Sequence, residues 1–223
     1  MRGIEYMIAD ERNDVPRKSK SDIAYEYIKK GIIEKKFFPG NQIIEEDIVK
    51  ATGVSRTSVR KALNLLQYEG ILEGKTTRGI IVAKHSVEDI ISTFRIREVL
   101  ETNAFELAVK NIDDEAIQKM KEYNEGLRKV SRNFNIIDFV KYNKDFHWVI
   151  ATATKDKYYM KYLNEIYNNI AVYLLFYNST VDDKRSIGYH NTIIEALIEG
   201  DVEKGKAAII ADNYCGIEDL AIK

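Results

Sequence analysis

Two groups of side chains in this sequence have residue types and spacings suited to chemistry. The first lies at residues 55–60, where hydroxyl and arginine side chains crowd the start of a segment with one apolar face. Arginine binds guanine edges and phosphate oxygens, and hydroxyl groups bind phosphate oxygens. This group predicts a surface that contacts double-stranded DNA through Ser55, Arg56, Thr57, Ser58 and Arg60.

The second group contains two of the three histidines of the chain. Asn143 and His147 are four residues apart in a segment with helical periodicity, so we expect them to project from the same helix face. His190 lies on a later segment of the same kind. The elements expected to position both groups follow from the periodicity of the apolar residues.

Residues 1–20 are polar and basic without sustained periodicity, which predicts a flexible basic arm. From Ser21 to about Glu34 the apolar residues recur at helical spacing, and Ser21 or Asp22 is the expected N-cap. Pro39 then predicts a turn.

A second short helix is expected from about Glu45 to Ala51, ending at Gly53. Ser55 is the expected N-cap of a third helix that runs to Leu66 and carries the hydroxyl and arginine residues. Its expected apolar face consists of Val59, Ala62, Leu63 and Leu66.

Two short strands are expected next, at Ile71–Glu73 and Gly79–Ala83. They predict a basic hairpin, and we expect DNA contacts from Thr77, Arg78 and Gly79. Three helices followed by a hairpin, with a tight turn before the third helix, are typical of a winged helix-turn-helix. We therefore expect this DNA-binding domain at residues 21–84.

Residues 85–223 are expected to form an all-helical antiparallel bundle, so the chain as a whole is predicted to be mainly α. The lone Cys215 lacks a partner for a disulfide and is expected to be a buried thiol. About six helices are predicted, at Val87–Asn111, Asp113–Ser131, Asn135–Thr152, Lys157–Tyr177, Asp182–Glu199 and Asp201–Ile222.

Charge is distributed unevenly along the 223 residues. Residues 1–84 hold 16 Lys and Arg against 12 Asp and Glu, whereas the remainder is acidic, so the net charge is −1. The excess of basic residues in the first part is consistent with phosphate binding. The sequence contains no apolar stretch typical of a signal peptide or a membrane span, so we expect a cytoplasmic protein with no membrane partner.

The first part resembles the GntR family of bacterial regulators. The matching segments are Phe38-Pro39-Gly40, the run from Gly53 to Leu63, Glu69-Gly70-Ile71-Leu72 and Arg78-Gly79. Ser58 and Lys61 stand where the family commonly has Pro and Glu. The acidic Glu45 and Glu46 stand where some members carry a DNA-contacting base, so no DNA contact is expected from the second helix.

The second part resembles the smaller, six-helix variant of the FCD effector-binding domain. The resemblance rests on the run from Phe94 to Glu101, on Asn143 through His147, and on His190 followed by Gly200-Asp201. In that family an Asp, a His four residues later and two further His bind a divalent metal. The positions that correspond here are Asn143, His147, His190 and Asp212.

The resemblance therefore implies one carboxylate, two imidazoles and one neutral amide in the ligand set. Zn, Ni, Fe or Mn suits such donors, with Asn143 as a weak ligand. The alternative is a metal-free cavity in which Asn143 and His147 are hydrogen-bonded polar groups. Arg97 matches a family arginine that meets the carboxylate of an effector, and the alternative for it is a pair with a helix-surface Glu.

Together these features predict a homodimeric, metabolite-responsive transcriptional repressor or activator. Its predicted partners are a palindromic DNA operator and a small organic acid that is held on the metal or in the bare cavity. Two alternatives remain at this stage. One is a metal-dependent enzyme fused to a DNA-binding domain, and the other is a DNA-binding protein without an effector.

Overall fold

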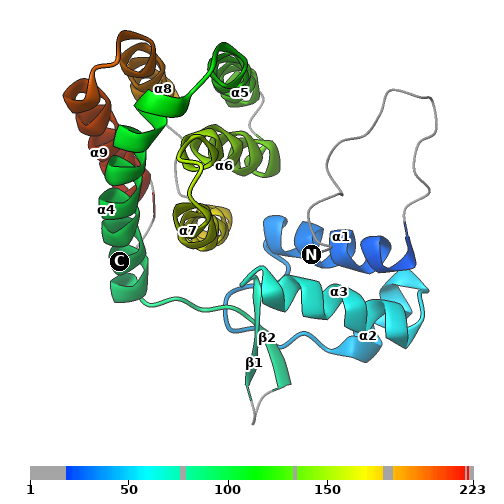
Figure 1. Ribbon diagram of the computed structural model, residues 1–223. Coiled ribbons are helices and arrows are strands. Elements are labelled where there is room, and N and C mark those ends of the chain that lie inside the picture. Colours follow the sequence, from blue (N-terminus) through cyan, green and yellow to red (C-terminus); the bar gives the residue numbers. More distant parts are fainter. Residues whose placement is uncertain (1–18, 76–78, 133–134, 178–182, 219, 221–223) are drawn as a thin grey trace, which may run out of the picture.

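The computed structural model describes residues 19–75, 79–132, 135–177, 183–218 and 220 (Figure 1). Within these ranges the chain forms nine helices and one two-stranded antiparallel sheet. Three helices and the sheet come first, and six helices follow. The predicted mainly α fold, a winged helix-turn-helix followed by a helical bundle, is confirmed.

Helix α1 spans Lys20–Ile33 and begins before the predicted Ser21. The expected N-cap, Ser21 or Asp22, is wrong because Ser19 forms a complete capping box. Its Oγ accepts from the backbone N of Asp22 at 3.2 Å, and Asp22 Oδ2 accepts from the backbone N of Ser19 at 2.8 Å. Residues 1–18 of the predicted arm lie outside the described residues.

Helix α2 spans Glu45–Thr52 and ends at Gly53, whose φ of 69° is the left-handed conformation that glycine favours. Helix α3 spans Arg56–Tyr68, two residues longer than expected, and Ser55 caps it as predicted. The predicted apolar face is buried, so α3 packs on α1 with its polar first turns exposed.

The wing consists of β1, Leu72–Lys75, and β2, Gly79–Val82, paired in antiparallel register from Leu72↔Val82 to Lys75↔Gly79. Strand β1 begins one residue later and ends two residues later than predicted, whereas β2 begins at the predicted Gly79 and ends one residue earlier than predicted. Gly79 has a φ of 68°, which lets the chain enter β2 without steric strain. The predicted contacts Thr77 and Arg78 lie outside the described residues.

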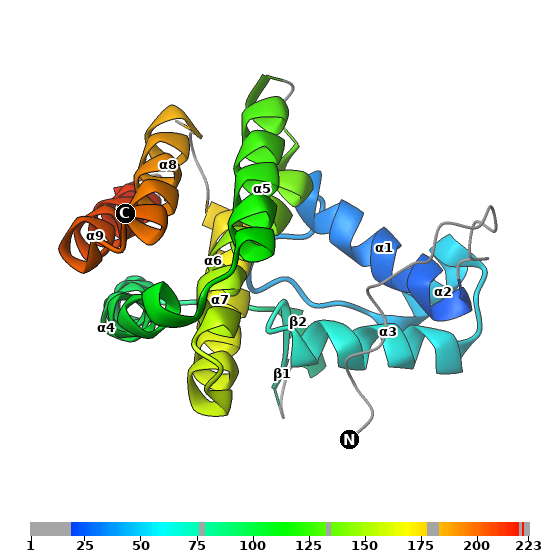
Figure 2. The ribbon, with the colours of Figure 1, turned by 45° about the horizontal axis from the view of Figure 1, so that its top comes forward.

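The six helices of the bundle pack side by side (Figures 1 and 2), and their buried apolar side chains form two clusters. The predicted bounds of α4 and α7 are confirmed, but α9 ends before the predicted Ile222, and residues 219 and 221–223 lie outside the described part of the chain. The helices are α4 (Val87–Asn111), α5 (Asp114–Arg132), α6 (Ile136–Ala153), α7 (Lys157–Tyr177), α8 (Asp183–Glu199) and α9 (Val202–Glu218).

Helix α7 also touches the winged helix. Val172 belongs to the same buried cluster as Ile28 of α1 and Leu66 of α3, with Leu175 and Phe176 packed against it. Both views place α7 on the side of the bundle that faces α1 (Figures 1 and 2). None of the described helices is long and apolar enough to cross a membrane.

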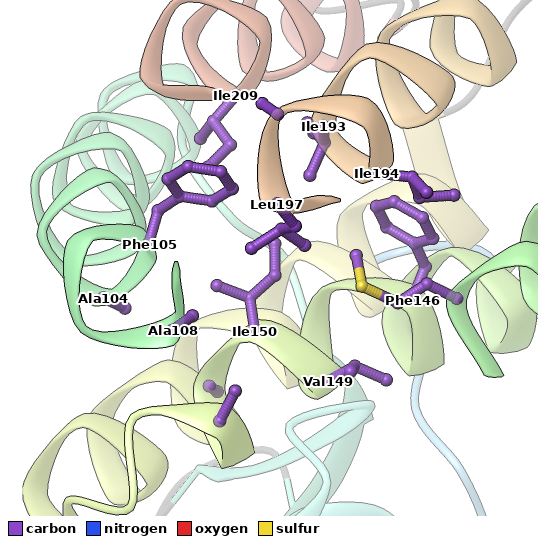
Figure 3. Close-up of a cluster of buried hydrophobic side chains, with 14 of the residues drawn as sticks. Ala104, Phe105, Ala108, Phe146, Val149, Ile150, Ile193, Ile194, Leu197 and Ile209 are labelled. Carbon is purple, nitrogen blue, oxygen red and sulfur yellow. The ribbon is translucent and has the colours of Figure 1, made fainter. Parts of the chain in front are cut away.

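The bundle core brings side chains of α4, α6, α8 and α9 together, including Phe105, Phe146, Leu197 and Ile209 (Figure 3). Cys215 is buried and forms no disulfide, as predicted. Close helix packing requires one glycine of α9. A Cβ at Gly205 would lie 2.0 Å from Phe105 Cζ.

Gly205→Ala therefore overpacks the contact between α9 and α4. We expect a loss of about 1–3 kcal/mol in the free energy of unfolding, measured by urea denaturation. Gly188→Ala is the matched control, because a Cβ at this helical glycine meets nothing within 4 Å. It should leave the protein as stable or raise its stability by up to about 1 kcal/mol. Equal midpoints for the two variants would contradict the packing argument.

Candidate functional site

The first turns of α3 carry the predicted DNA-contacting side chains. Arg56, Thr57 and Arg60 are exposed. Ser55 and Ser58 act first on the helix itself, since Ser55 Oγ accepts from the backbone N of Ser58 at 3.2 Å and the two hydroxyl oxygens are 2.9 Å apart. The exposed N-terminal end of α3 therefore presents two guanidinium groups and a hydroxyl to a ligand.

Both arginines are paired with acidic residues of α2. Arg56 Nη2 lies 2.7 Å from Glu46 Oε1, and Arg60 Nε lies 2.9 Å from Glu45 Oε2. By family resemblance, these glutamates stand where some members carry a DNA-contacting base. In the structure they are instead the ion-pair partners of the two α3 arginines.

In the bundle, three of the four residues expected to bind metal converge. His147 of α6, His190 of α8 and Asp212 of α9 are all buried. The two Nε2 atoms are 3.2 Å apart, Asp212 Oδ2 lies 3.2 Å from His147 Nε2, and Asp212 Oδ1 lies 3.5 Å from His190 Nε2. Asn143 lines the adjoining cavities beside them.

Hydrogen bonds on the far side of each imidazole assign its proton. His147 Nδ1 donates to Glu101 Oε1 at 2.6 Å. His190 Nδ1 donates to Asn124 Oδ1 at 3.2 Å, because the amide NH₂ of Asn124 already donates to Ile187 O and Asn191 Oδ1. In its neutral form each ring therefore directs an Nε2 lone pair toward the same point, which favours a cation or a donor there.

Arg97 of α4 supplies such a donor. Its Nη2 donates to His147 Nε2 at 2.9 Å and to Asp212 Oδ2 at 3.0 Å, while its Nε donates to Glu101 Oε2 at 2.7 Å. Arg97 is buried, so the expected alternative of a pair on the helix surface is wrong, although a glutamate four residues later is indeed its partner. The guanidinium binds two of the three atoms that a metal would use.

The charges of this cluster compensate one another. Burial by itself raises the pKa of Glu101, but Arg97 and His147 outweigh it and lower the pKa to about 2. Burial also opposes the charge of Asp212, yet the neighbouring His190 and His147 hold its pKa well below the usual range. Burial lowers the pKa of His190, and the neighbouring Asp212 opposes this shift.

The cluster opens onto two adjoining cavities, and both are lined by Arg97 and Asn143. Lys144, His147 and Tyr167 line the first cavity. Ser186 and Asp212 line the second, where Ser186 Oγ donates to Asp212 Oδ1 at 2.7 Å. A small anion that enters either cavity meets the Arg97 guanidinium.

The donor set also fits a divalent metal. Ligand atoms about 2.0–2.1 Å from a tetrahedral ion are about 3.3 Å apart, close to the 3.2 Å between the two Nε2 atoms, and each ring lies 3.2 or 3.5 Å from a different oxygen of Asp212. Each imidazole already has the outer hydrogen bond that orients metal-binding histidines. His147, His190 and Asp212 would hold the ion, after Arg97 gives up its bonds to two of them.

Comparison with known proteins decides the family. The model of the FCD domain matches residues 92–212, and the model of bacterial regulatory proteins of the gntR family matches residues 20–82. The chain belongs to the GntR family of transcriptional regulators, with an FCD domain. The alternative of a metal-dependent enzyme is not supported, because the families and relatives found are transcriptional regulators.

Similar GntR regulators occur in several bacteria. The uncharacterized HTH-type transcriptional regulator YdhC of Bacillus subtilis is 26% identical over 190 residues, 84% of each chain. The probable D-xylose utilization operon transcriptional repressor of Paenarthrobacter nicotinovorans is 25% identical over 76% of this chain and 75% of its own.

Solved GntR structures share the fold. McbR/YncC of E. coli superposes with a TM-score of 0.69 at 19% identity, covering 90% of this chain and 98% of its own. A putative GntR regulator from Rhodococcus sp. RHA1 has a TM-score of 0.67 at 20% identity, covering 90% and 97%.

Arg97, His147, His190 and Asp212, with the two cavities beside them, form what we call the FCD pocket. Three further residues of this pocket were not predicted from the sequence. Glu101, Asn124 and Ser186 each hold a histidine, an arginine or the aspartate in place. Only Glu101 carried a signal, because it lies four residues after Arg97 on the same helix. Asn124 and Ser186 come from α5 and α8, and only the tertiary fold brings them to the pocket.

Arg97→Met tests the charge balance of the FCD pocket. Removing the guanidinium leaves Glu101 and Asp212 buried without their main cationic partner, so we expect a loss of about 3–5 kcal/mol in unfolding free energy by urea denaturation. Arg95→Met is the control, because Arg95 is exposed on the same helix. A loss no larger than that of the control would show that the cluster does not depend on Arg97.

Proposed function

We propose that this chain acts as a homodimer that binds a palindromic operator through α3 and the wing, and that a small organic acid in the FCD pocket changes its DNA affinity. One observation supports the proposal above all. A buried arginine, two histidines and an aspartate meet beside cavities in the domain attached to the winged helix. A metabolite in these cavities would act on a neighbouring DNA-binding unit.

The proposed DNA contacts come from the end of α3 and from the wing. Arg56, Thr57 and Arg60 are exposed at the start of α3, as a helix that enters the major groove requires. Gly79 is exposed at the start of β2, where it pairs with Lys75 at the end of the wing farthest from Leu72 and Val82. The proposed contacts are Ser55, Arg56, Thr57, Ser58, Arg60, Thr77, Arg78 and Gly79.

Exposed apolar side chains support the proposal of a dimer. Ile96 and Val99 lie three residues apart on α4 and are 50% and 59% exposed. A second copy of the chain that covers this face would bury both side chains and present two winged helices. Two such readers need two half-sites in fixed register, which a palindromic operator provides.

The proposed effector is a small organic acid because Arg97 has a donor to spare. Nε and Nη2 are occupied by Glu101, His147 and Asp212, whereas Nη1 has no hydrogen bond within the described residues. A carboxylate in either cavity would accept from Nη1. Arginine suits this role because its delocalised positive charge persists when the side chain is buried.

We also propose that a divalent metal, Zn, Ni, Fe or Mn, binds to His147, His190 and Asp212, with Asn143 as a weak fourth ligand. When bound, such an ion supplies a positive charge and open coordination positions for the carboxylate of the acid. Its affinity is expected to be lower than with a fully charged ligand set, because an amide oxygen carries no charge.

Arg60→Ala tests the DNA proposal. A duplex enriched from a random-sequence library by the wild-type chain serves as the ligand, and fluorescence anisotropy measures affinity. We expect a loss of about 1–3 kcal/mol, since the proposed guanine contact is removed. Arg95→Ala in the bundle should bind as the wild type does. Failure of the wild type to enrich any motif, or unchanged affinity of Arg60→Ala, would refute the proposed reading by α3.

His190→Ala tests the metal proposal. We expect chelator-treated wild type to take up one Zn²⁺ per chain in a calorimetric titration, and the variant to bind at least about tenfold more weakly. His85→Ala is the control, because this histidine lies in the segment before α4, outside the His147, His190 and Asp212 group. No uptake by the wild type, or equal uptake by His190→Ala, favours the metal-free cavity.

A further inference from the structure

Arg56 and Arg60 of α3 use different nitrogen atoms in their ion pairs with the glutamates of α2. Arg60 uses Nε toward Glu45 at 2.9 Å, whereas Arg56 uses Nη2 toward Glu46 at 2.7 Å. Arginine binds guanine through two N–H groups that point at O6 and N7 together. The nitrogen that is already occupied therefore determines how many terminal N–H groups each arginine has free for this fork.

Arg60 keeps its fork. With Nε held by Glu45, its terminal Nη1 and Nη2 have no hydrogen bond within the described residues, so all four terminal N–H groups are free. Arg56 has one terminal nitrogen bound to Glu46, so one N–H of its terminal pair is engaged by that carboxylate. Both arginine side chains are similarly exposed, at 66% and 64%, so access does not distinguish them.

The two glutamates differ as anchors. The side chain of Glu45, at the first residue of α2, is 26% exposed, whereas that of Glu46 is 61% exposed. A partly buried side chain loses less conformational entropy when it forms an ion pair, so Glu45 restrains Arg60 better than Glu46 restrains Arg56. Exposed ion pairs contribute little to stability. We therefore expect these ion pairs to affect how the two arginines are oriented toward DNA, and to affect the stability of the fold very little.

The carboxylates also act on DNA by their charge. A glutamate close to the backbone repels phosphates, so a surface that carries Glu45 and Glu46 binds DNA of arbitrary sequence less tightly than a purely basic surface. At a G·C pair this cost is offset, because arginine binds the guanine and a neighbouring carboxylate can accept from cytosine N4. Acidic partners thus favour base contacts over phosphate contacts.

We propose that Glu45 is a positioning residue that makes Arg60 the guanine reader of this regulator, while Glu46 lowers binding to DNA of arbitrary sequence by its charge. This inference rests on the proposed function, because it assumes that α3 contacts the bases. It assigns a specificity role to the acidic start of α2, where no DNA contact was expected.

The test is a selection from a random-sequence duplex library with the full-length wild type, Glu45→Ala, Glu46→Ala, Glu45→Gln and Arg60→Ala. We expect the wild type to enrich a motif with a guanine that Arg60→Ala no longer selects. Glu45→Ala should reduce the preference for that same guanine from at least about tenfold to below about threefold. Glu46→Ala is the matched control, because it removes an equal charge from the same helix turn and should keep the guanine.

Glu45→Gln separates geometry from charge and guards against misfolding of Glu45→Ala. Glu45→Gln retains an oxygen that accepts from Arg60 Nε, so it should keep most of the guanine preference. Each of the three glutamate variants, Glu45→Ala, Glu46→Ala and Glu45→Gln, should bind a non-enriched random duplex a fewfold more tightly than the wild type, because each has lost a negative charge. Full guanine preference in Glu45→Ala, or its equal loss in Glu46→Ala, would overturn the inference. A wild type that enriches no motif would instead refute the proposed function.

Discussion

The bundle is organised around one buried cation that has to be neutralised. Arg97 of α4 lies against Glu101 on its own helix, His147 of α6 and Asp212 of α9, and all four side chains are buried. Burial of any one of these charges alone would be very costly, so the helices that carry them must pack in one arrangement. That arrangement places Arg97 at the wall of both cavities.

The pocket and the DNA-binding unit share helix α7. Tyr167, Ala171 and Leu174 of this helix line the first cavity. Val172, one residue further round the helix, belongs to the core of the winged helix. A ligand that moves α7 by a small amount therefore acts on both units. Such coupling requires that the ligand bind the two arrangements of the chain with different affinity.

Much of the fold was predictable because the apolar residues repeat so regularly. The bounds of α4 and α7 follow from this repeat, and Ser55 and Gly53 mark the ends of helices by local chemistry alone. The start of α1 was misplaced because Ser19 and Ser21 are both plausible caps, and only the reciprocal bond with Asp22 selects Ser19.

The candidate site was predictable only in part. Family resemblance brought His147, His190 and Asp212 together, and the structure agrees. The burial of Arg97, and its bonds to atoms that a metal could use, could not be inferred, since a charged residue on a helix is usually exposed.

The proposed control of DNA binding by an acid in the FCD pocket is tested most directly by the affinity of the wild type and of Arg97→Met for the enriched operator. Fluorescence anisotropy measures this affinity with and without a panel of small organic acids and Zn²⁺. The account predicts that at least one acid changes wild-type affinity by about 5- to 150-fold and has no effect on Arg97→Met. Wild-type affinity that no acid alters, or an equal response in the variant, would contradict it.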